Sequence, residues 1–276
     1  MTVIQEATTH PKDTLLRVDR FPHIWCPTCG IGTAVSCFID AIRATGIDEK
    51  QFAVVSGIGC TGRVAGYIRL DSFHTTHGRA IPFAVGLHLA KPDMKVIVFS
   101  GDGDISCIGG NHLIHTARRN MDITVICVNN FIYGMTGGQL APTTPQTART
   151  TTSPYGNFEY PMSLPHVVSA CGATYVSRWT VLHIKRLTRA MKDAILHRGF
   201  SFVEVIAPCS TLCARKNRLG TGTNMLSYYH DHCEINHEAN LADVGLDYQG
   251  KIVCGNFLTI EKPTFRDLLE ENREEV

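Results

Sequence analysis

Two short polar segments in the middle of the chain could bind a divalent metal ion and phosphate. The segment GDGD, residues 101–104, follows one apolar stretch, and Asn129-Asn130 ends the next, twenty-five residues after Asp104. Carboxylate and amide oxygens are hard ligands that suit Mg²⁺, which completes its octahedron with a carbonyl, water and phosphate oxygens. Glycines let the backbone approach phosphate, and amides at the start of a following helix can donate hydrogen bonds to it. The spacing therefore predicts a site for a magnesium-bound phosphate group.

Four cysteines are placed where they could share a second metal centre. Cys26 and Cys29 form a C-x-x-C pair just before an expected helix, whose N-terminal amides lower thiol pKa values. Cys60 and Cys209 each follow an expected strand, and the topology puts them at the same edge of the sheet. Four such thiolates could hold a structural zinc ion or a [4Fe–4S] cluster. Cys213 competes with Cys209 for the fourth position.

The remaining cysteines show no ligand pattern of this kind. Three lie in expected helices or strands, where free cysteine packs as a small hydrophobe: Cys37, Cys127 and Cys171. The others have no assigned role: Cys107, Cys233 and Cys254.

The elements that must position these residues follow from hydrophobic spacing. Helical periodicity predicts helices at 30–46, 78–90, 110–120, 163–171 and 181–197, and apolar runs predict strands at 52–56, 95–100, 123–130 and 201–207. Alternating strands and helices imply right-handed crossovers and an α/β fold, with a mostly parallel sheet and helices on both faces. In such sheets the ligand crevice lies outside the carboxyl ends of the strands. The polar and cysteine-bearing segments fall there.

The chain divides into three expected parts. Residues 1–22 are a polar arm, residues 23–215 form the main domain, and residues 216–276 form an extension that packs on the same domain or on a partner. The Thr- and Pro-rich segment 136–161 lacks periodicity and predicts an ordered loop over a cofactor or a partner. The segment 228–233 is rich in Tyr, His and Cys, and its spacing favours interface packing over a metal site.

Composition argues against nucleic-acid and membrane partners. The 276 residues include 26 basic and 25 acidic side chains, so the basic excess typical of nucleic-acid binding is missing. The sequence shows neither an apolar run of ~18 residues nor a secretory start, and we expect a cytoplasmic protein. There the 11 cysteines are not a disulfide framework. Charged residues make up only 18%, which leaves surface for a protein partner.

The two polar segments resemble the thiamine-diphosphate-binding motif, in which GDG is followed at this spacing by NN. The resemblance implies a thiamine-diphosphate-binding fold with Mg²⁺ held by Asp102, the side-chain oxygen of Asn130 and the carbonyl of Ile132. It implies cofactor contacts by Ile58, Gly59, Cys60, His77, Gly78, Gly101, Gly103, Asp104, Gly134, Met135 and Thr136. The nearest alternative is a dinucleotide site, but the segment that begins at Gly57 does not complete G-x-G-x-x-G.

Over about residues 20–215 the chain resembles the β subunit of 2-oxoacid:ferredoxin oxidoreductases. The resemblance implies that a proximal [4Fe–4S] cluster is held by Cys26, Cys29, Cys60 and Cys209. It implies decarboxylation of a 2-oxoacid on thiamine diphosphate, transfer of the acyl group to coenzyme A and passage of electrons to ferredoxin. It also implies a partner α subunit that supplies the activating glutamate, in an (αβ)₂ heteromer.

Two glycine-rich segments bear on the substrate. GIGCTGRVAGY and FHTTHGRAIPFAVGLHLA look most like the 2-oxoglutarate-specific members, so we expect 2-oxoglutarate and succinyl-CoA, with pyruvate as the alternative substrate. Arg63 could bind a carboxylate and His74 could donate to a developing enolate, although either could have a structural role instead. A non-redox thiamine decarboxylase or synthase, or a zinc-stapled binding subunit, are the competing functions. The direction of the reaction, oxidation or carboxylation, stays open.

Overall fold

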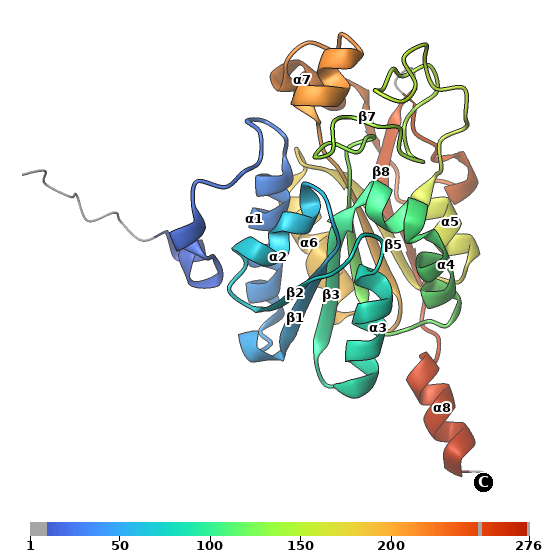
Figure 1. Ribbon diagram of the computed structural model, residues 1–276. Coiled ribbons are helices and arrows are strands. Elements are labelled where there is room, and N and C mark those ends of the chain that lie inside the picture. The colour runs from blue at the N-terminus through green and yellow to red at the C-terminus, as the bar shows by residue number, and fades with distance from the viewer. Residues whose placement is uncertain (1–9, 248–249, 275–276) are drawn as a thin grey trace, which may run out of the picture.

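Eight strands form one sheet in the order β2-β1-β3-β4-β6-β5-β8-β7 (Figure 1). The computed structural model describes residues 10–247 and 250–274. The strands are β1 (Phe52–Ser56), β2 (Asp71–His74), β3 (Lys95–Gly101), β4 (Thr124–Asn129), β5 (Tyr175–Thr180), β6 (Ser201–Ile206), β7 (Cys233–Ile235) and β8 (Ile252–Thr259). Strands β1 to β6 pair in parallel, β8 runs antiparallel to β5, and β7 pairs in parallel with β8. The predicted α/β fold with a mostly parallel sheet is confirmed.

Helices cover both faces of this sheet (Figure 1). The described helices are α1 (Ile31–Thr45), α2 (Val64–Tyr67), α3 (Ala80–Ala90), α4 (Gly110–Arg118), α5 (Leu164–Ala170), α6 (Ile184–Leu196), α7 (Gly222–His232) and α8 (Phe265–Glu274). One hydrophobic core joins the sheet to α1 and α6, and a second joins it to α3, α4 and α5. Strands such as β1 and β4 are buried along their whole length because both faces of the sheet are covered.

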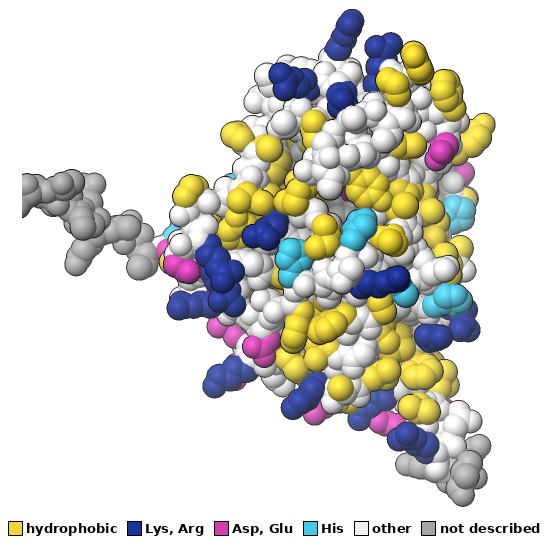
Figure 2. Space-filling view, viewed as in Figure 1, with side chains coloured by type: hydrophobic (Ala, Val, Ile, Leu, Met, Phe, Trp, Pro, Cys, Tyr) yellow, Lys and Arg dark blue, Asp and Glu magenta, His cyan; other side chains and the backbone are white. Residues whose placement is uncertain are grey.

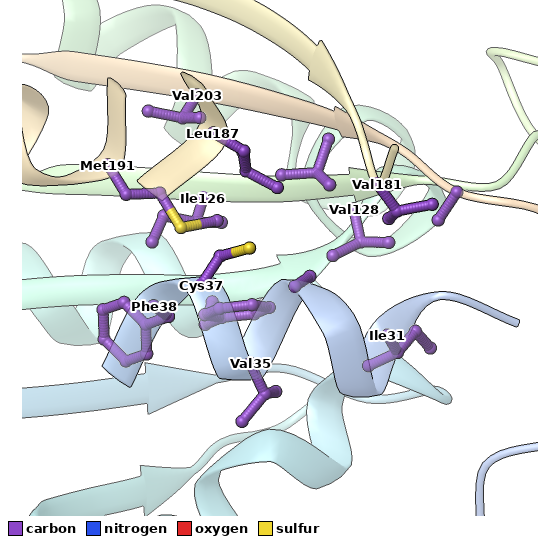
Figure 3. Packing of buried hydrophobic residues seen from close by; sticks show 14 of the residues in the cluster. Ile31, Val35, Cys37, Phe38, Ile126, Val128, Val181, Leu187, Met191 and Val203 are labelled. Atoms are coloured by element: carbon purple, nitrogen blue, oxygen red, sulfur yellow. The ribbon is translucent and has the colours of Figure 1, made fainter. Parts of the chain in front are cut away.

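The first core shows why α1 lies where it does. Its apolar residues recur every three or four positions and point at the sheet, where Phe38 meets Phe99 edge to face with ring centroids 5.3 Å apart. Figure 3 shows side chains of α1 meeting those of β4 and α6. Gly30 precedes this helix with a φ of 78°, and a Cβ there would lie 3.0 Å from Val181. Glycine therefore lets the loop that bears Cys29 close onto the sheet.

All nine expected helices and strands are present, most with slightly shifted ends, and four strands were missed. Strand β2 is a short, largely exposed edge strand, so it lacks the apolar run that marks a buried strand. Strand β5 contains a buried arginine, which breaks the apolar pattern. Strands β7 and β8 lie in the segment 216–276, whose residues extend the same sheet beyond residue 215. The domain limits themselves stay a prediction.

The expected N-terminal arm lies partly outside the described residues. In its described part, residues 10–22, two short 3₁₀ turns occur at Pro11–Leu15 and Val18–Arg20, and Leu15 is buried against the main body. None of the described helices is both long and apolar enough to cross a membrane.

Candidate functional site

A cavity of 390 Å³ opens at the carboxyl ends of β1, β3 and β4. The chain runs from β1 out to the edge strand β2 and then returns to β3 on the other side of β1. Such a reversal leaves a crevice between the loops that follow β1 and β3, and ligands of open α/β sheets bind there. The cavity therefore lies where the topology predicts a ligand.

The cavity gathers nearly all of the predicted cofactor residues. It is lined by Ile58, Gly59, Cys60, His77, Gly101, Gly103, Asp104, Gly134, Met135 and Thr136, together with the predicted magnesium ligands Asp102, Asn130 and Ile132. Gly78 is the exception: it does not line the cavity, and its amide donates a hydrogen bond to Asp104 Oδ1 at 2.8 Å. Sequence reasoning missed Thr61, Tyr133 and Gln139, which also line it.

Asp102 carries a carboxylate that the fold has withdrawn from water. The residue is 2% exposed, and this burial raises the pKa of its carboxyl to about 6, against the opposing effect of hydrogen bonds from Thr143 and from three backbone amides. Thr143 Oγ1 donates to Asp102 Oδ2. A buried carboxylate in this position is stabilised by a cation, which supplies the opposite charge that solvent no longer screens.

Asn130 adds a second oxygen that lacks a protein partner. Its Oδ1 atom is buried and accepts no hydrogen bond from any described residue, and the residue is 8% exposed. A buried polar atom without a partner costs about 1–3 kcal/mol unless a ligand or water satisfies it. The carboxylate of Asp102, this amide oxygen and the nearby carbonyl of Ile132 form the set of hard oxygens that Mg²⁺ takes, so the residues present fit the ion.

Asp104 holds the loops of the cavity together. Its carboxylate accepts hydrogen bonds from the Ile58 amide at 3.1 Å and from Ser100 Oγ at 2.9 Å, and it pairs with His77 Nδ1 at 2.6 Å. A Cβ on Gly57 would lie 1.9 Å from this carboxylate, so only glycine permits the close approach. One acid thus ties the loops after β1 and β2 to the end of β3.

The four predicted cysteines surround a second hollow beside the first. This hollow of 270 Å³ is lined by Cys26, Cys29, Cys60 and Cys209. The two cavities share Cys60, Asn130, Gly134 and Met135 as a common wall. A group held by the cysteines would therefore be separated from a ligand of the first cavity by a single layer of residues.

Specific contacts bring the cysteine-bearing loops together. The Trp25 indole Nε1 donates to the carbonyl of Cys60 at 2.8 Å, and Ser210 Oγ donates to the carbonyl of Pro27 at 3.1 Å. A Cβ on Gly134 would lie 3.4 Å from the Cys60 sulfur and 3.8 Å from the Cys209 sulfur. These contacts join the C-x-x-C loop to the turns after β1 and β6.

The spread of the sulfurs bears on the kind of metal centre. Burial, and then the three neighbouring sulfurs, raise the pKa of the Cys60 thiol to about 11, so the four groups interact electrostatically. A tetrahedral zinc ion with Zn–S bonds of about 2.3 Å would hold its sulfurs about 3.8 Å apart. Among the described residues no three of these sulfurs lie within 4.8 Å of one another. The four sulfurs are therefore not drawn in to the spacing of a four-sulfur zinc site.

Other predicted site residues lie away from the two cavities. Arg63 and His74 are exposed and are not among the described residues that line either cavity, so their catalytic roles stay a prediction. Cys213, the competitor of Cys209, is 1% exposed and packs in the first core.

The segment 136–161 is ordered and reaches the site. Thr143, in its first half, contacts Asp102, while Thr144 Oγ1 donates to the Phe131 carbonyl at 2.7 Å. Three aromatic residues in its second half point to solvent, with exposures of 88% for Tyr155, 83% for Phe158 and 87% for Tyr160. The contact places this segment beside the predicted magnesium ligand, and no sequence pattern had marked Thr143 as its neighbour.

Comparison with known proteins identifies the fold around these cavities. The family described as "Thiamine pyrophosphate enzyme, C-terminal TPP binding domain" matches residues 57–205, more than half of the chain. A solved structure, "2-oxoglutarate:ferredoxin oxidoreductase from Magnetococcus marinus with 2-oxoglutarate, coenzyme A and succinyl-CoA bound", is similar with a TM-score of 0.85. It is 31% identical in sequence, and the match covers 99% of this chain and 92% of that one.

Curated relatives match along most of their own length. The 2-oxoglutarate synthase subunit KorB of Methanocaldococcus jannaschii is 48% identical over 263 residues, which cover 95% of this chain and 97% of the relative. The subunit of the same name from Methanothermobacter marburgensis is 46% identical over 258 residues, covering 94% and 90%. This chain therefore belongs to the family of 2-oxoacid:ferredoxin oxidoreductase β subunits, within the group of 2-oxoglutarate synthase KorB subunits, and the resemblance seen in its motifs is confirmed.

Proposed function

We propose that this chain is the subunit of a 2-oxoglutarate:ferredoxin oxidoreductase that binds thiamine diphosphate, Mg²⁺ and a [4Fe–4S] cluster. The reaction converts 2-oxoglutarate, coenzyme A and two oxidised ferredoxins into succinyl-CoA, CO₂, a proton and two reduced ferredoxins, and the same groups serve the reverse carboxylation. The observation that carries this proposal is the shared wall between the cavity of Asp102 and Asn130 and the hollow of the four cysteines.

The residues of the first cavity would bind and orient the cofactor. Asp102, Asn130 Oδ1 and the Ile132 carbonyl would hold Mg²⁺ against the diphosphate, and Thr143 would orient the Asp102 carboxylate. Gly101 and Gly103 leave room for phosphate at the end of β3. When bound, thiamine diphosphate supplies a nucleophilic carbon for the keto group and accepts the electron pair that loss of CO₂ leaves behind.

A cluster held by the four cysteines would accept these electrons one at a time. Cys26, Cys29, Cys60 and Cys209 would provide the four thiolates that a [4Fe–4S] cluster takes, and their sulfurs are not at the spacing of a four-sulfur zinc site. Ferredoxin would then accept the electrons from the cluster.

A partner subunit would complete the catalytic site. Within the described part of the chain, no glutamate lines the first cavity, so the acid that activates the aminopyrimidine would come from an α subunit. Figure 2 shows hydrophobic side chains gathered on the visible face over α3 and β2, where Phe73 and Phe83 are partly exposed. Together with the exposed aromatics of the segment 136–161, this surface supports a heteromer, which we propose to be (αβ)₂.

Anaerobic electron paramagnetic resonance of the purified complex tests the proposal. Adding 2-oxoglutarate should produce a reduced [4Fe–4S] signal together with an organic radical, and pyruvate should produce a weaker response. A Cys209→Ser variant should lose the cluster signal, whereas Cys171→Ser, which changes another half-buried cysteine, should keep it. A wild-type complex that is silent with every 2-oxoacid would refute the redox function, and a stronger response to pyruvate would overturn the substrate.

A further inference from the structure

A separate group of metal-binding side chains lies at the end of the sheet formed by β5, β8 and β7. The ligating atoms of His183, Cys233 and Cys254 all lie within 4.8 Å of one another. His183 sits in the turn between β5 and α6, Cys233 follows α7, and Cys254 lies in β8. None of these residues lines either of the two cavities described above.

A hydroxyl group partners one nitrogen of the imidazole. Thr180 Oγ1 lies 3.0 Å from His183 Nδ1 and accepts the Leu182 amide at 3.2 Å. A neutral ring that donates one N–H keeps a lone pair on its other nitrogen, and that nitrogen can bind a metal ion. Metal-ligating histidines usually have such an oxygen partner on the second nitrogen.

The two thiols contact each other. Cys254 is fully buried, and its thiol donates a hydrogen bond to Cys233 Sγ, which also lies within hydrogen-bonding reach of Thr180. A divalent ion could replace the shared proton and hold both sulfurs as thiolates.

The strand pairing argues against a disulfide between the same two residues. Cys233 pairs with Ile252 across parallel strands, so Cys254 lies two residues further along on the same face of the sheet. With strands about 4.8 Å apart and a rise of about 3.3 Å per residue, the two Cα atoms are about 8 Å apart. A disulfide rarely spans more than about 7 Å between Cα atoms. A metal ion can bridge the longer span, because it adds two bonds of about 2.3 Å between the sulfurs.

We propose that His183, Cys233 and Cys254 bind a divalent ion of the zinc class, with water in the fourth position. The donor set of one imidazole and two thiolates suits this borderline-soft ion, and the two thiolates balance its charge while their protons pass to solvent. The ion would join the turn after β5 to β7 and β8, and so fasten the C-terminal extension to the sheet.

The test measures zinc and iron in the anaerobically purified complex after equilibration with Zn²⁺ and gel filtration. We expect one zinc ion per chain in the wild type and in the Cys171→Ser control, and less than a tenth of that in Cys233→Ser, with unchanged iron. Thr180→Val keeps all three ligands and should weaken zinc binding about tenfold in a chelator competition.

Three results with the wild type and Cys233→Ser would overturn this site. The first is a wild-type complex without zinc, and the second is zinc content that Cys233→Ser leaves unchanged. The third is a Cys233–Cys254 disulfide found by mass spectrometry after alkylation. Zinc that disappears in Cys209→Ser but not in Cys233→Ser would place the ion at the cysteine quartet instead. If Cys233→Ser fails to assemble, the chelator competition with Thr180→Val tests the site instead. Unchanged zinc affinity in Thr180→Val would contradict the site.

Discussion

A buried ion pair lies next to the strand end that carries Asn129 and Asn130. Arg178 Nε and Glu204 Oε2 are 2.5 Å apart, and the two side chains are 0% and 1% exposed. Glu204 Oε1 accepts a second hydrogen bond from Asn129 Nδ2 at 2.7 Å. Replacing Glu204 with glutamine keeps one oxygen as the acceptor for Asn129, but it removes the charge and turns an NH₂ donor toward Arg178 Nε. The guanidinium of Arg178 is then left in the core without a counter-ion.

The expected cost is large because water cannot reach the remaining charge. Removing one partner of a buried ion pair costs about 3–5 kcal/mol. For a chain of this size that corresponds to a fall in Tm of about 10 °C. The double variant Arg178→Met with Glu204→Gln removes both charges, so it should recover at least half of the loss.

The chain offers a matched control with the same geometry in solvent. Arg266 Nε and Glu270 Oε1 are also 2.5 Å apart, but their side chains are 42% and 55% exposed. Glu270→Gln should cost only about 0.3–0.5 kcal/mol, or about 1 °C. Thermal scans of the purified complexes at one scan rate and one concentration compare the variants. If Glu204→Gln lowers Tm no more than Glu270→Gln does, the pair is not desolvated as the structure indicates.

Three further outcomes follow from the two cavities and the loops around them. Asp102→Asn removes the buried charge and should weaken binding of thiamine diphosphate with Mg²⁺ at least tenfold in calorimetric titrations. Chelation of Mg²⁺ should release the cofactor from the wild type. Equal affinity in variant and wild type would contradict the proposed ligand. Thr143→Val removes only the hydrogen bond to Asp102 and should raise the Kd for Mg²⁺ about tenfold at unchanged iron content, whereas Thr151→Val, in the same segment, should not change it. Replacing Phe158 and Tyr160 with serine should weaken association with the α subunit in ultracentrifugation while leaving Tm of the isolated chain within about 2 °C, because both side chains are exposed; unchanged association would exclude this surface from the interface.

Several features of the fold could be predicted because they depend on local patterns. The buried strands β1, β3, β4 and β6 are apolar runs, and α1 repeats its apolar residues at helical spacing, so their positions follow from periodicity. Strand β5 was not predicted, because Arg178 interrupts its apolar pattern. Only the structure explains a buried arginine at this position, by placing Glu204 beside it on the adjacent strand β6. Strand β2 escaped it because an exposed edge strand needs no apolar face.

The candidate site divides in the same way. The spacing of GDG and NN places Asp102 and Asn130 at adjacent strand ends, since the carboxyl ends of neighbouring parallel strands meet at one edge of the sheet. Contacts between loops cannot be predicted in this way, because no regular geometry fixes the path of a loop. The approach of Thr143 to Asp102 depends on how a 26-residue segment without periodicity folds back, as does the order of its aromatics.

The sequence alone determines which residues could do chemistry and where the buried strands lie along the chain, because hydrophobic periodicity and glycine turns depend on a few neighbouring residues. They sufficed to predict a parallel sheet, a magnesium–diphosphate site and a cysteine centre. The core position of Cys213, the unpartnered oxygen of Asn130 and the convergence of His183 with two distant cysteines required the folded chain. Each depends on packing between segments far apart in sequence, where small differences in loop path decide which side chain faces a cavity and which enters the core.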